Sequence, residues 1–414
     1  MSFLRAEPVE AARTSQGTGA GTDLIVIGAG VMGAWVALQG CREGWRTTLI
    51  DAYGAGHPRA TSGDETRIIR ASHSVDPFYS RWSREALIDW NALAEATGES
   101  LFVPAGVLWL ASDEEGWEAA SEATLRRLGI PVERLSPTEL SARWPQLAAD
   151  DLAFGVFEPE GGLLMARRGV AAVARTFVAE GGRFELAWAE PGATNGRRLL
   201  EVTTNDGTRH AAHEFVFAAG PWLPRLFPRV LGDLIRVTKQ DVVFVGPPAG
   251  DGRFAAERLP CWLDSRGGFY GVPAVDGRGM KVGPDRYGPP FDPTDGERIV
   301  DPESVRSVRS YMARRFPDLA DAPVVETRVC QYETTPDSQF IIDRHPDFDN
   351  VWLVGGGSGH GFKHGPVIGR HVVGRLNGAG VGAGEERFGL DRARTPQTTL
   401  RTGSFSMDEG RSDG

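Results

Sequence analysis

The stretch Asp23-Leu-Ile-Val-Ile27-Gly28-Ala-Gly30-Val-Met-Gly33 decides the fold class that this sequence predicts. Residues 23–27 are a continuous apolar and β-branched run, which is typical of a strand buried in a parallel sheet. Residues 31–43 predict a helix, and residues 46–50 predict a second strand. A strand, a glycine-rich turn, a helix and a strand in this order predict the first unit of a nucleotide-binding α/β domain.

The glycines and the acid of this unit suit a dinucleotide. Gly28, Gly30 and Gly33 permit a tight turn and a close approach of the backbone to a pyrophosphate at the helix N-terminus. Asp51 ends the second strand, where an acid accepts hydrogen bonds from a ribose. The pattern does not distinguish FAD from NAD, and a glycine-rich turn without a ligand is the alternative explanation.

Composition and charge restrict the class of protein. The chain has 414 residues, of which 41% are hydrophobic and 24% charged, as expected for two globular domains or one large composite domain. The net charge of −10 argues against nucleic acid or an anionic membrane as a general partner. A small anionic substrate would therefore need local positive charge at its site.

The cysteines and the start of the chain favour a cytoplasmic protein. Cys41, Cys261 and Cys330 are too few and too scattered for a disulfide framework. Residues 1–23 contain no apolar signal core, which argues against secretion. The apolar run 24–40 carries the glycines of the nucleotide turn, so it predicts a buried strand and helix rather than a membrane span.

Two later segments are expected to return to the nucleotide-binding sheet. Residues 215–222 form an apolar strand that stops at Gly-Pro, and residues 351–354 lead into three glycines and a helix from Pro366. Other stretches alternate apolar and polar residues between Gly and Pro turns, which predicts a mostly antiparallel second sheet. These stretches are residues 154–157, 242–245, 268–272 and 279–282.

The nucleotide-binding domain is therefore predicted to be discontinuous, with a substrate domain inserted into it. The nucleotide-binding segments are residues 23–90, 160–230 and 338–379. The substrate-domain segments are residues 91–159 and 231–337. Both ends of the chain are rich in Gly, Thr, Ser and Arg, and we expect mobile tails at residues 1–22 and 380–414.

Two arginines follow the nucleotide-binding unit in the segment Asp64-Glu-Thr-Arg67-Ile-Ile-Arg70. A guanidinium group can bind a carboxylate through two parallel hydrogen bonds, each worth roughly 1.5–3 kcal/mol because it is charged. The arginines could thus form an anion site beside a cofactor. A surface segment in which they pair with Asp64 and Glu65 explains the pattern equally well.

Five further residues have ordinary explanations by residue type alone. Cys330 would be a small buried side chain, and Tyr270 an aromatic residue of a strand packed in a core. Lys281 and Lys363 would be exposed lysines, and His360 a loop histidine that contacts the backbone. The spacing of histidines, cysteines and acids predicts no metal site, and the absence of a Gly-x-Ser-x-Gly elbow argues against a hydrolase.

Taken together, six motifs in order resemble those of the monomeric sarcosine oxidase and N-methyltryptophan oxidase group, within the D-amino-acid-oxidase-like FAD oxidoreductases. The resemblance extends over about residues 23–376. The motifs are Gly28-Ala-Gly30-Val-Met-Gly33, Asp64-Glu-Thr-Arg67-Ile-Ile-Arg70, Tyr270-Gly-Val-Pro273, Gly279-Met-Lys281, Cys330-Gln-Tyr332 through Pro336-Asp337, and Ser358-Gly-His-Gly-Phe-Lys363.

The resemblance implies an α/β fold with an FAD-binding Rossmann-like domain of the glutathione-reductase type and a mostly antiparallel substrate domain. It also implies that FAD is bound covalently, through a thioether between Cys330 and the flavin ring. The other residues that it assigns to the cofactor are Gly28, Gly30, Gly33, Asp51, Thr66, Gly359 and Gly361.

Further roles near the flavin ring are implied by the same resemblance. Arg67 should lie near the ring and shape its electrostatics. Lys281 should stand over the ring and help dioxygen accept electrons, a role that suits a fixed cation because negative charge develops there. Arg70 and Lys363 should hold the substrate carboxylate, and Tyr270 should line the substrate pocket.

The sequence departs from the family pattern near the substrate. Asp285 stands where sarcosine-oxidising members are expected to carry a histidine, and Ser62 and Gly63 stand where such members often carry histidines. An acid at position 285 would repel a bare carboxylate but suit an added amine, ammonium or hydroxyl group on the substrate. This departure argues against sarcosine itself as the substrate.

We therefore expect an oxidase of a secondary or cyclic amino acid, such as an N-alkyl amino acid or an imino acid. Hydride transfer to the flavin gives an imine, and dioxygen reoxidises the flavin with release of hydrogen peroxide. The nearest alternative is a flavin-dependent dehydrogenase or desaturating tailoring enzyme that acts on a piperideine-carboxylate-like substrate. A non-catalytic flavin-binding protein and a nicotinamide dehydrogenase are more remote alternatives. The expected partners are the amino-acid substrate and dioxygen, and a monomer is expected.

Overall fold

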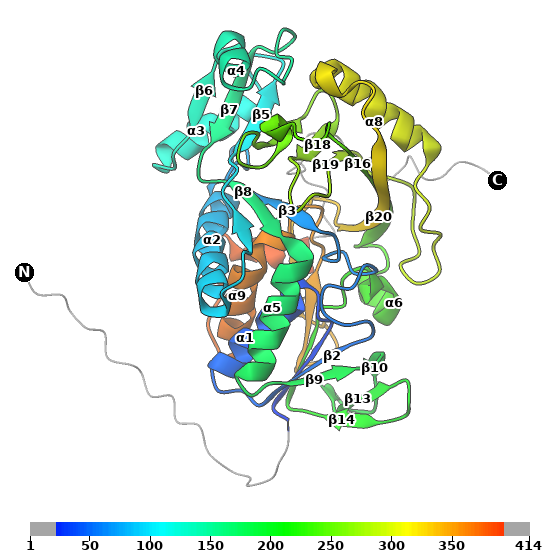
Figure 1. The fold of residues 1–414 in the computed structure, drawn as a ribbon. Helices are drawn as coiled ribbons and strands as arrows, with labels where there is room; N and C mark the ends of the chain where they lie inside the picture. Colours follow the sequence, from blue (N-terminus) through cyan, green and yellow to red (C-terminus); the bar gives the residue numbers. More distant parts are fainter. Residues whose placement is uncertain (1–21, 393–414) are drawn as a thin grey trace, which may run out of the picture.

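The computed structural model describes residues 22–392, which form two large β-sheets with helices packed around them (Figure 1). Most of the predicted N-terminal tail and residues 393–414 of the predicted C-terminal tail lie outside the described residues.

The first large sheet has six strands in the order β21-β22-β15-β1-β2-β9. Strands β22, β15, β1, β2 and β9 pair with their neighbours in parallel, and β21 pairs antiparallel with β22 at the edge. This is the parallel sheet that the apolar runs predict, including the two expected returns. The strands are β1 (Leu24–Ile27), β2 (Thr47–Asp51), β9 (Arg183–Leu186), β15 (Glu214–Phe217), β21 (Ile341–Arg344) and β22 (Val351–Gly355).

Side chains of this sheet alternate between two hydrophobic cores, because successive residues of a strand point to opposite faces. Leu24 and Val26 belong to the core shared with four helices, which Figure 1 shows grouped together beside the sheet. Ile25 and Ile27 belong to the core on the other face. The four helices are α1 (Val31–Arg42), α2 (Pro77–Thr97), α5 (Ala166–Ala179) and α9 (Gly365–Leu376).

Short elements cover the second face. Their apolar residues include Ala189, Val202 and Leu223, which share the core of Ile25 and Ile27. The elements are β10 (Ala189–Pro191), β11 (Thr194–Asn195), β12 (Arg198–Leu199), β13 (Glu201–Thr204), β14 (Arg209–Ala211), α6 (Leu223–Leu226) and α7 (Pro228–Leu231).

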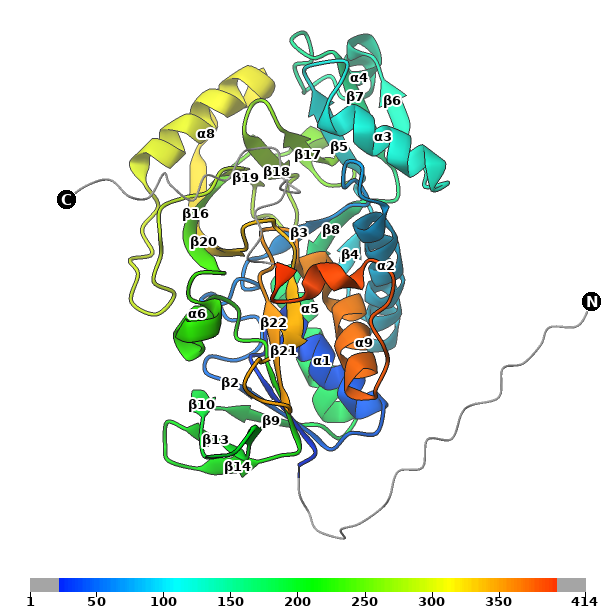
Figure 2. The same ribbon diagram turned by 180° about the vertical axis from the view of Figure 1, so that it is seen from behind.

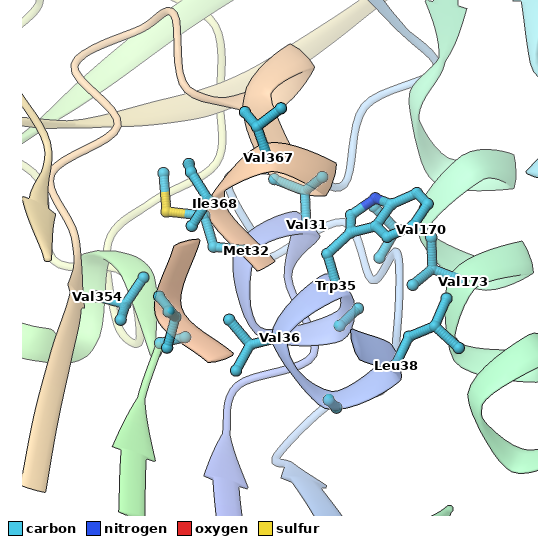
Figure 3. Close-up of a cluster of buried hydrophobic side chains, with 14 of the residues drawn as sticks. Val31, Met32, Trp35, Val36, Leu38, Val170, Val173, Val354, Val367 and Ile368 are labelled. Carbon is cyan, nitrogen blue, oxygen red and sulfur yellow. The ribbon is translucent and has the colours of Figure 1, made fainter. Parts of the chain in front are cut away.

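Helix α1 is buried on nearly every side because it lies between the sheet and two other helices. Figure 3 shows Trp35 beside Val170 and Val173 of α5, and Met32 beside Ile368 of α9. The backbones of α1 and α9 approach so closely that a Cβ atom added at Gly369 would lie 2.7 Å from the Trp35 carbonyl oxygen. This packing fixes the N-terminus of α1, which faces the predicted nucleotide site.

The second large sheet has eight strands in the order β20-β16-β19-β18-β17-β5-β7-β6. Its neighbours pair antiparallel except β17 and β5, which pair in parallel, so the predicted mostly antiparallel sheet is present. The strands are β5 (Val107–Ala111), β6 (Glu133–Leu135), β7 (Phe154–Glu158), β16 (Arg236–Val245), β17 (Cys261–Asp264), β18 (Phe269–Val272), β19 (Met280–Pro284) and β20 (Val324–Thr334).

Three helices and a small sheet complete the framework. The helices, which Figure 1 shows around the eight-stranded sheet, are α3 (Trp117–Arg127), α4 (Pro137–Arg143) and α8 (Pro302–Arg315). The small sheet consists of β3 (Thr66–Ile69), β8 (Gly162–Met165) and β4 (Phe102–Val103). Among residues 22–392, no helix has both the length and the apolar composition needed to cross a membrane.

Sheet membership follows the predicted segments. Every strand of the six-stranded sheet comes from the segments assigned to the nucleotide-binding domain, and every strand of the eight-stranded sheet comes from those assigned to the substrate domain. The exact boundaries between the two domains stay a prediction.

The prediction that a loose tail begins at residue 380 is wrong for residues 385–392. These residues form a short 3-10 helix (Glu385–Phe388) that lies against β21, and they appear in red in Figure 2. Phe388 is 1% exposed and packs against Trp82, with 5.1 Å between the ring centroids. Arg392 pairs with buried Asp337 at 2.7 Å. The polar composition of this segment gave no indication that Phe388 and Arg392 each have a buried partner.

Candidate active site

One cavity connects the six-stranded sheet with the eight-stranded sheet. It runs from the carboxyl ends of β1, β2, β15 and β22 to residues of β18, β19 and β20, and its empty volume is about 1900 Å³ including space open to solvent. The cavity therefore reaches from the glycine turn after β1 to Lys281 and Cys330 of the eight-stranded sheet. The predicted site residues that line it are Gly28, Gly30, Asp51, Arg67, Arg70, Tyr270, Lys281, Asp285, Cys330, Gly359, Gly361 and Lys363.

Two predicted site residues do not line the cavity. A Cβ atom at Gly33 would lie 1.9 Å from the Gly28 carbonyl oxygen, so this glycine allows α1 to pack against the turn after β1. The carbonyl of Thr66 accepts hydrogen bonds from Arg67 at 2.8 Å and from Lys281 at 3.0 Å. Both residues thus contact residues that line the cavity without lining it themselves. Direct contact of either residue with a cofactor stays a prediction.

The turn between β1 and α1 has the features that a pyrophosphate requires. Gly28 has φ +104°, and a Cβ atom there would lie 2.4 Å from the Ala218 carbonyl oxygen, so only glycine fits. Gly30 faces the cavity as the N-cap of α1. Ser62 accepts a hydrogen bond from the Val31 N–H at 3.0 Å and also lines the cavity. The exposed backbone and the helix N-terminus fit a dinucleotide phosphate.

Asp51 stands at the end of β2, where the sequence predicts it. Its carboxylate accepts hydrogen bonds from the N–H groups of Ala29 at 2.7 Å, Tyr53 at 2.8 Å and Gly54 at 2.7 Å. These bonds fasten the loop after β2 to the glycine turn and hold the carboxylate at the cavity wall. These three partners all belong to the backbone, and the hydrogen bonds from Asp51 to a ribose stay a prediction.

A buried carboxylate at the cavity wall, that of Asp64, pairs with three cations. Asp64 is 6% exposed and forms an ion pair with Lys281, which is 3% exposed. It also pairs with Arg67 at 2.9 Å and with Arg328 at 3.5 Å. Burial alone would raise the pKa of Asp64, but Lys281 and Arg67 lower it well below its usual value. Burial lowers the pKa of Lys281, and Asp64 opposes that shift.

Arg67 also joins this cluster to the cysteine expected to carry the flavin. Its guanidinium donates to the Thr61 carbonyl at 2.6 Å and to Cys330 Sγ at 3.3 Å. Burial opposes the charge on Arg67, but Cys330 and Asp64 together raise its pKa. Arg67 therefore pairs with Asp64, as the ion-pair interpretation states, although it does so in the interior. The role of Arg70 in an anion site stays a prediction.

Arg70 and Lys363 are cations without a carboxylate partner among residues 22–392. Arg70 donates to the Ser72 carbonyl, and its guanidinium lies 4.9 Å from the Trp109 ring centroid and 5.6 Å from that of Trp117. Lys363, 2% exposed, donates to the His360 carbonyl at 2.9 Å. The structure describes no ion pair for either cation, although both line the cavity.

The lowered pKa values of these two groups show that burial opposes their charge. Burial lowers the pKa of Arg70 to about 10, with Glu158 opposing the shift. Burial, and the charge of Arg70, lower the pKa of Lys363 well below its usual value. Because buried charges are normally paired, this end of the cavity is suited to binding an anion such as a carboxylate.

Tyr270 and Asp285 lie on the part of the cavity wall formed by the eight-stranded sheet. The Lys281 ammonium is 5.9 Å from the Tyr270 ring centroid, so the two residues face the same space. Asp285 follows β19 directly, and its N–H donates to the Gly268 carbonyl at 2.7 Å. Their predicted contact with a substrate is compatible with these positions and stays a prediction.

Several residues in or beside the cavity wall were not predicted from the sequence. Trp109 and Trp117 flank Arg70, and Arg328 and Glu333 lie on β20 on either side of Cys330. The tryptophans carry no motif that distinguishes them from core residues. The position of Glu333, three residues after the predicted site residue Cys330 on the same strand, was the available signal.

Comparison with known proteins identifies the class to which this fold and this cavity belong. The family model described as FAD dependent oxidoreductase (DAO) matches residues 23–375. The chain is 30% identical to monomeric sarcosine oxidase of Streptomyces avermitilis over 359 residues, which cover 85% of this chain and 92% of that protein. It is 28% identical to N-methyl-L-tryptophan oxidase of Yersinia pestis over 353 residues, which cover 84% and 92%.

A solved structure agrees at the level of the fold. L-proline dehydrogenase from P. horikoshii superposes with a TM-score of 0.79 at 22% identity and covers 90% of this chain and 97% of that one. The chain therefore belongs to the DAO family of FAD-dependent oxidoreductases.

The depressed pKa of Lys363 makes anion binding depend on pH. A bound carboxylate favours the charged lysine, so acetate should bind with uptake of a proton at any pH above the lowered pKa. Its affinity should fall as the pH rises, by up to about tenfold per unit. Titration calorimetry of the holoenzyme in two buffers of different ionisation enthalpy measures this uptake.

The matched control is Lys363→Arg, which keeps a charge that does not titrate in this range. It should bind acetate without proton uptake. Equal proton uptake in both proteins would show that another group is responsible.

Proposed function

We propose that this chain oxidises a secondary or cyclic amino acid at the carbon next to nitrogen, with Arg70 and Lys363 binding the substrate carboxylate. The observation that supports this proposal is a pair of cations at the cavity wall, the half-buried Arg70 and the buried Lys363, for which the described residues supply no carboxylate partner. Two charge-assisted contacts from fixed positions would orient the substrate, and such positioning supplies much of the rate of an enzymatic reaction.

The substrate class agrees with the names of the relatives. Sarcosine and N-methyl-L-tryptophan, after which those two enzymes are named, are N-methyl amino acids. Bound FAD supplies the two-electron oxidation of such an amine, and dioxygen is the acceptor that we propose. The amine would bind uncharged, so that no strong base of the protein is required.

Lys281 is the residue that we propose to assist dioxygen. It is held in the cavity wall by Asp64 and by the Thr66 carbonyl, and it faces the space between Tyr270 and Arg67. Lys281 and Arg67 share the one carboxylate of Asp64, so these three groups keep one net positive charge, whereas Arg328 also pairs with Glu65 and Glu326. A positive charge fixed in this way favours the negative charge that develops on dioxygen.

Asp285 extends the proposal to the remote part of the substrate. It lines the same cavity, and its carboxylate would repel a second bare carboxylate. We propose that it faces an amine or hydroxyl group of a substrate larger than sarcosine.

The carboxylate anchor has a direct test. Arg70→Met should lower kcat/KM for the best substrate of a panel of N-methyl and cyclic amino acids by about 100-fold, because charge-assisted hydrogen bonds are lost. Peroxide formation measures this rate. The carboxamide of the same substrate lacks the carboxylate charge, so its kcat/KM should already be low with the wild type. Arg70→Met should lower the kcat/KM of the carboxamide only slightly further. Absence of peroxide formation and of flavin bleaching across the panel would contradict the proposed function.

The covalent tether is proposed from the position of Cys330, whose sulfur faces the cavity beside Arg67. Acid precipitation of the wild type should leave the flavin in the pellet, whereas Cys330→Ala should release it to the supernatant. Absorbance of both fractions measures the distribution. Cys41→Ala is the matched control, because Cys41 lies outside the cavity lining, and it should keep its flavin. Release of flavin by the wild type would refute the tether.

Removing the cation at Lys281 should affect the reaction with dioxygen selectively. Lys281→Met should slow flavin reoxidation by roughly 100-fold, the loss typical when one group that stabilises developing charge is removed. Substrate affinity and the rate of anaerobic flavin reduction should change much less. Stopped-flow absorbance separates the two half-reactions, and equal losses in both would argue for a purely structural lysine.

A further inference from the structure

Glu333 is a buried carboxyl at the end of β20 that none of the roles above uses. It is 5% exposed and lines the cavity. A Cβ atom added at Gly220 would lie 3.2 Å from its Oε2, and one added at Gly357 would lie 3.3 Å from its Oε1. The carboxyl therefore reaches across the loops that follow β15 and β22, at the carboxyl edge of the six-stranded sheet.

One oxygen of this carboxyl is unsatisfied. Oε2 is buried and has no hydrogen-bond partner among the described residues, and no ion pair of those residues involves Glu333. Burial raises the pKa of Glu333 to about 7, and the N–H of Gly357 opposes the shift. A buried polar atom without a partner is costly, so Oε2 is placed to bond something that enters the cavity.

The order of the strands indicates which part of FAD lies there. A dinucleotide in this kind of sheet runs along the carboxyl ends of the strands, with its pyrophosphate at the glycine turn after β1. Asp51, at the end of β2, marks the adenosine side, and β15 and β22 follow on the other side of β1. The segment between the pyrophosphate and the flavin ring is the ribityl chain, a polyol.

We propose that Glu333 is a cofactor-binding residue whose carboxyl forms a hydrogen bond with a hydroxyl group of the FAD ribityl chain. A hydroxyl can both donate and accept, so it fits the carboxyl in either protonation state. A pyrophosphate oxygen fits less well, because an ionised carboxylate would repel it. The inference rests on the FAD dependence of the family and not on the proposed amine substrate.

A purely structural role for Glu333 uses other atoms. Its backbone carbonyl accepts a hydrogen bond from the Ser358 N–H at 2.9 Å, and its Oε1 side faces Gly357. Both contacts hold the glycine-rich loop after β22, and neither needs Oε2. The test must therefore report on a hydroxyl of the cofactor rather than on folding or activity.

The test is reversible reconstitution of the full chain in a Cys330→Ser background, which allows FAD to dissociate whether or not Cys330 forms a tether. The ligands are FAD and its 2′-, 3′- and 4′-deoxyribityl analogues, and quenching of tryptophan fluorescence gives each Kd. One analogue should bind about tenfold more weakly than FAD, the value of one hydrogen bond. Glu333→Met should bind FAD about tenfold more weakly and abolish that difference.

Two further variants complete the design. Glu333→Gln, which can still bond a hydroxyl, should restore the preference for FAD, and Glu303→Ala, at an exposed acid of α8, should behave like the parent. For each analogue, the ratio of its Kd to the Kd of FAD is compared between Glu333→Met and the parent. If all these ratios are the same in both proteins, the proposal is overturned. If Glu333→Met fails to fold, the measurements on the Cys330→Ser parent still test the proposal. Equal affinity of the parent for FAD and for all three analogues overturns the proposal as well.

Discussion

The arrangement of the site depends on one buried interaction, the carboxylate of Asp64 shared by Lys281, Arg67 and Arg328. Asp64 precedes β3, whereas Lys281 and Arg328 lie on β19 and β20 of the eight-stranded sheet. The ion pairs therefore join segments of the two large units of the molecule at the cavity itself. Breaking a buried pair of this kind by removing one partner typically costs about 3–5 kcal/mol, since it leaves an uncompensated charge. The same contacts that position the cations thus hold the cavity together.

The local part of this architecture was predictable, and the reason is physical. Strand β1, helix α1 and strand β2 are adjacent in the sequence, and each carries its own pattern of apolar residues and glycines. The family motifs also placed most of the predicted site residues on the cavity wall. The pairing of Asp64 with Lys281 could not be predicted in this way, because 217 residues separate the partners and no periodicity connects them. The packing of Phe388 depends likewise on a pocket built by distant segments.

Charge is distributed very unevenly in this acidic chain. The net charge is −10, yet the cavity wall contains Arg67, Arg70, Lys281 and Lys363, and the acids closest to them are already engaged. Glu158, for example, accepts the Ala71 N–H at 2.6 Å and the Trp109 indole N–H at 3.3 Å. We therefore expect a small anion to bind at the end of the cavity that holds Arg70 and Lys363, because low-dielectric walls concentrate the local field there.

The carboxylate at the end of β2 has a consequence for the choice of nucleotide. Asp51 is held in place by three backbone N–H groups, so it cannot swing away from the cavity. A ribose with free hydroxyl groups can approach such a carboxylate, whereas a ribose that carries a 2′-phosphate would bring a second negative charge against it. We therefore expect a nucleotide with a 2′-phosphate, such as NADP, to bind poorly at the end of the cavity where Asp51 lies.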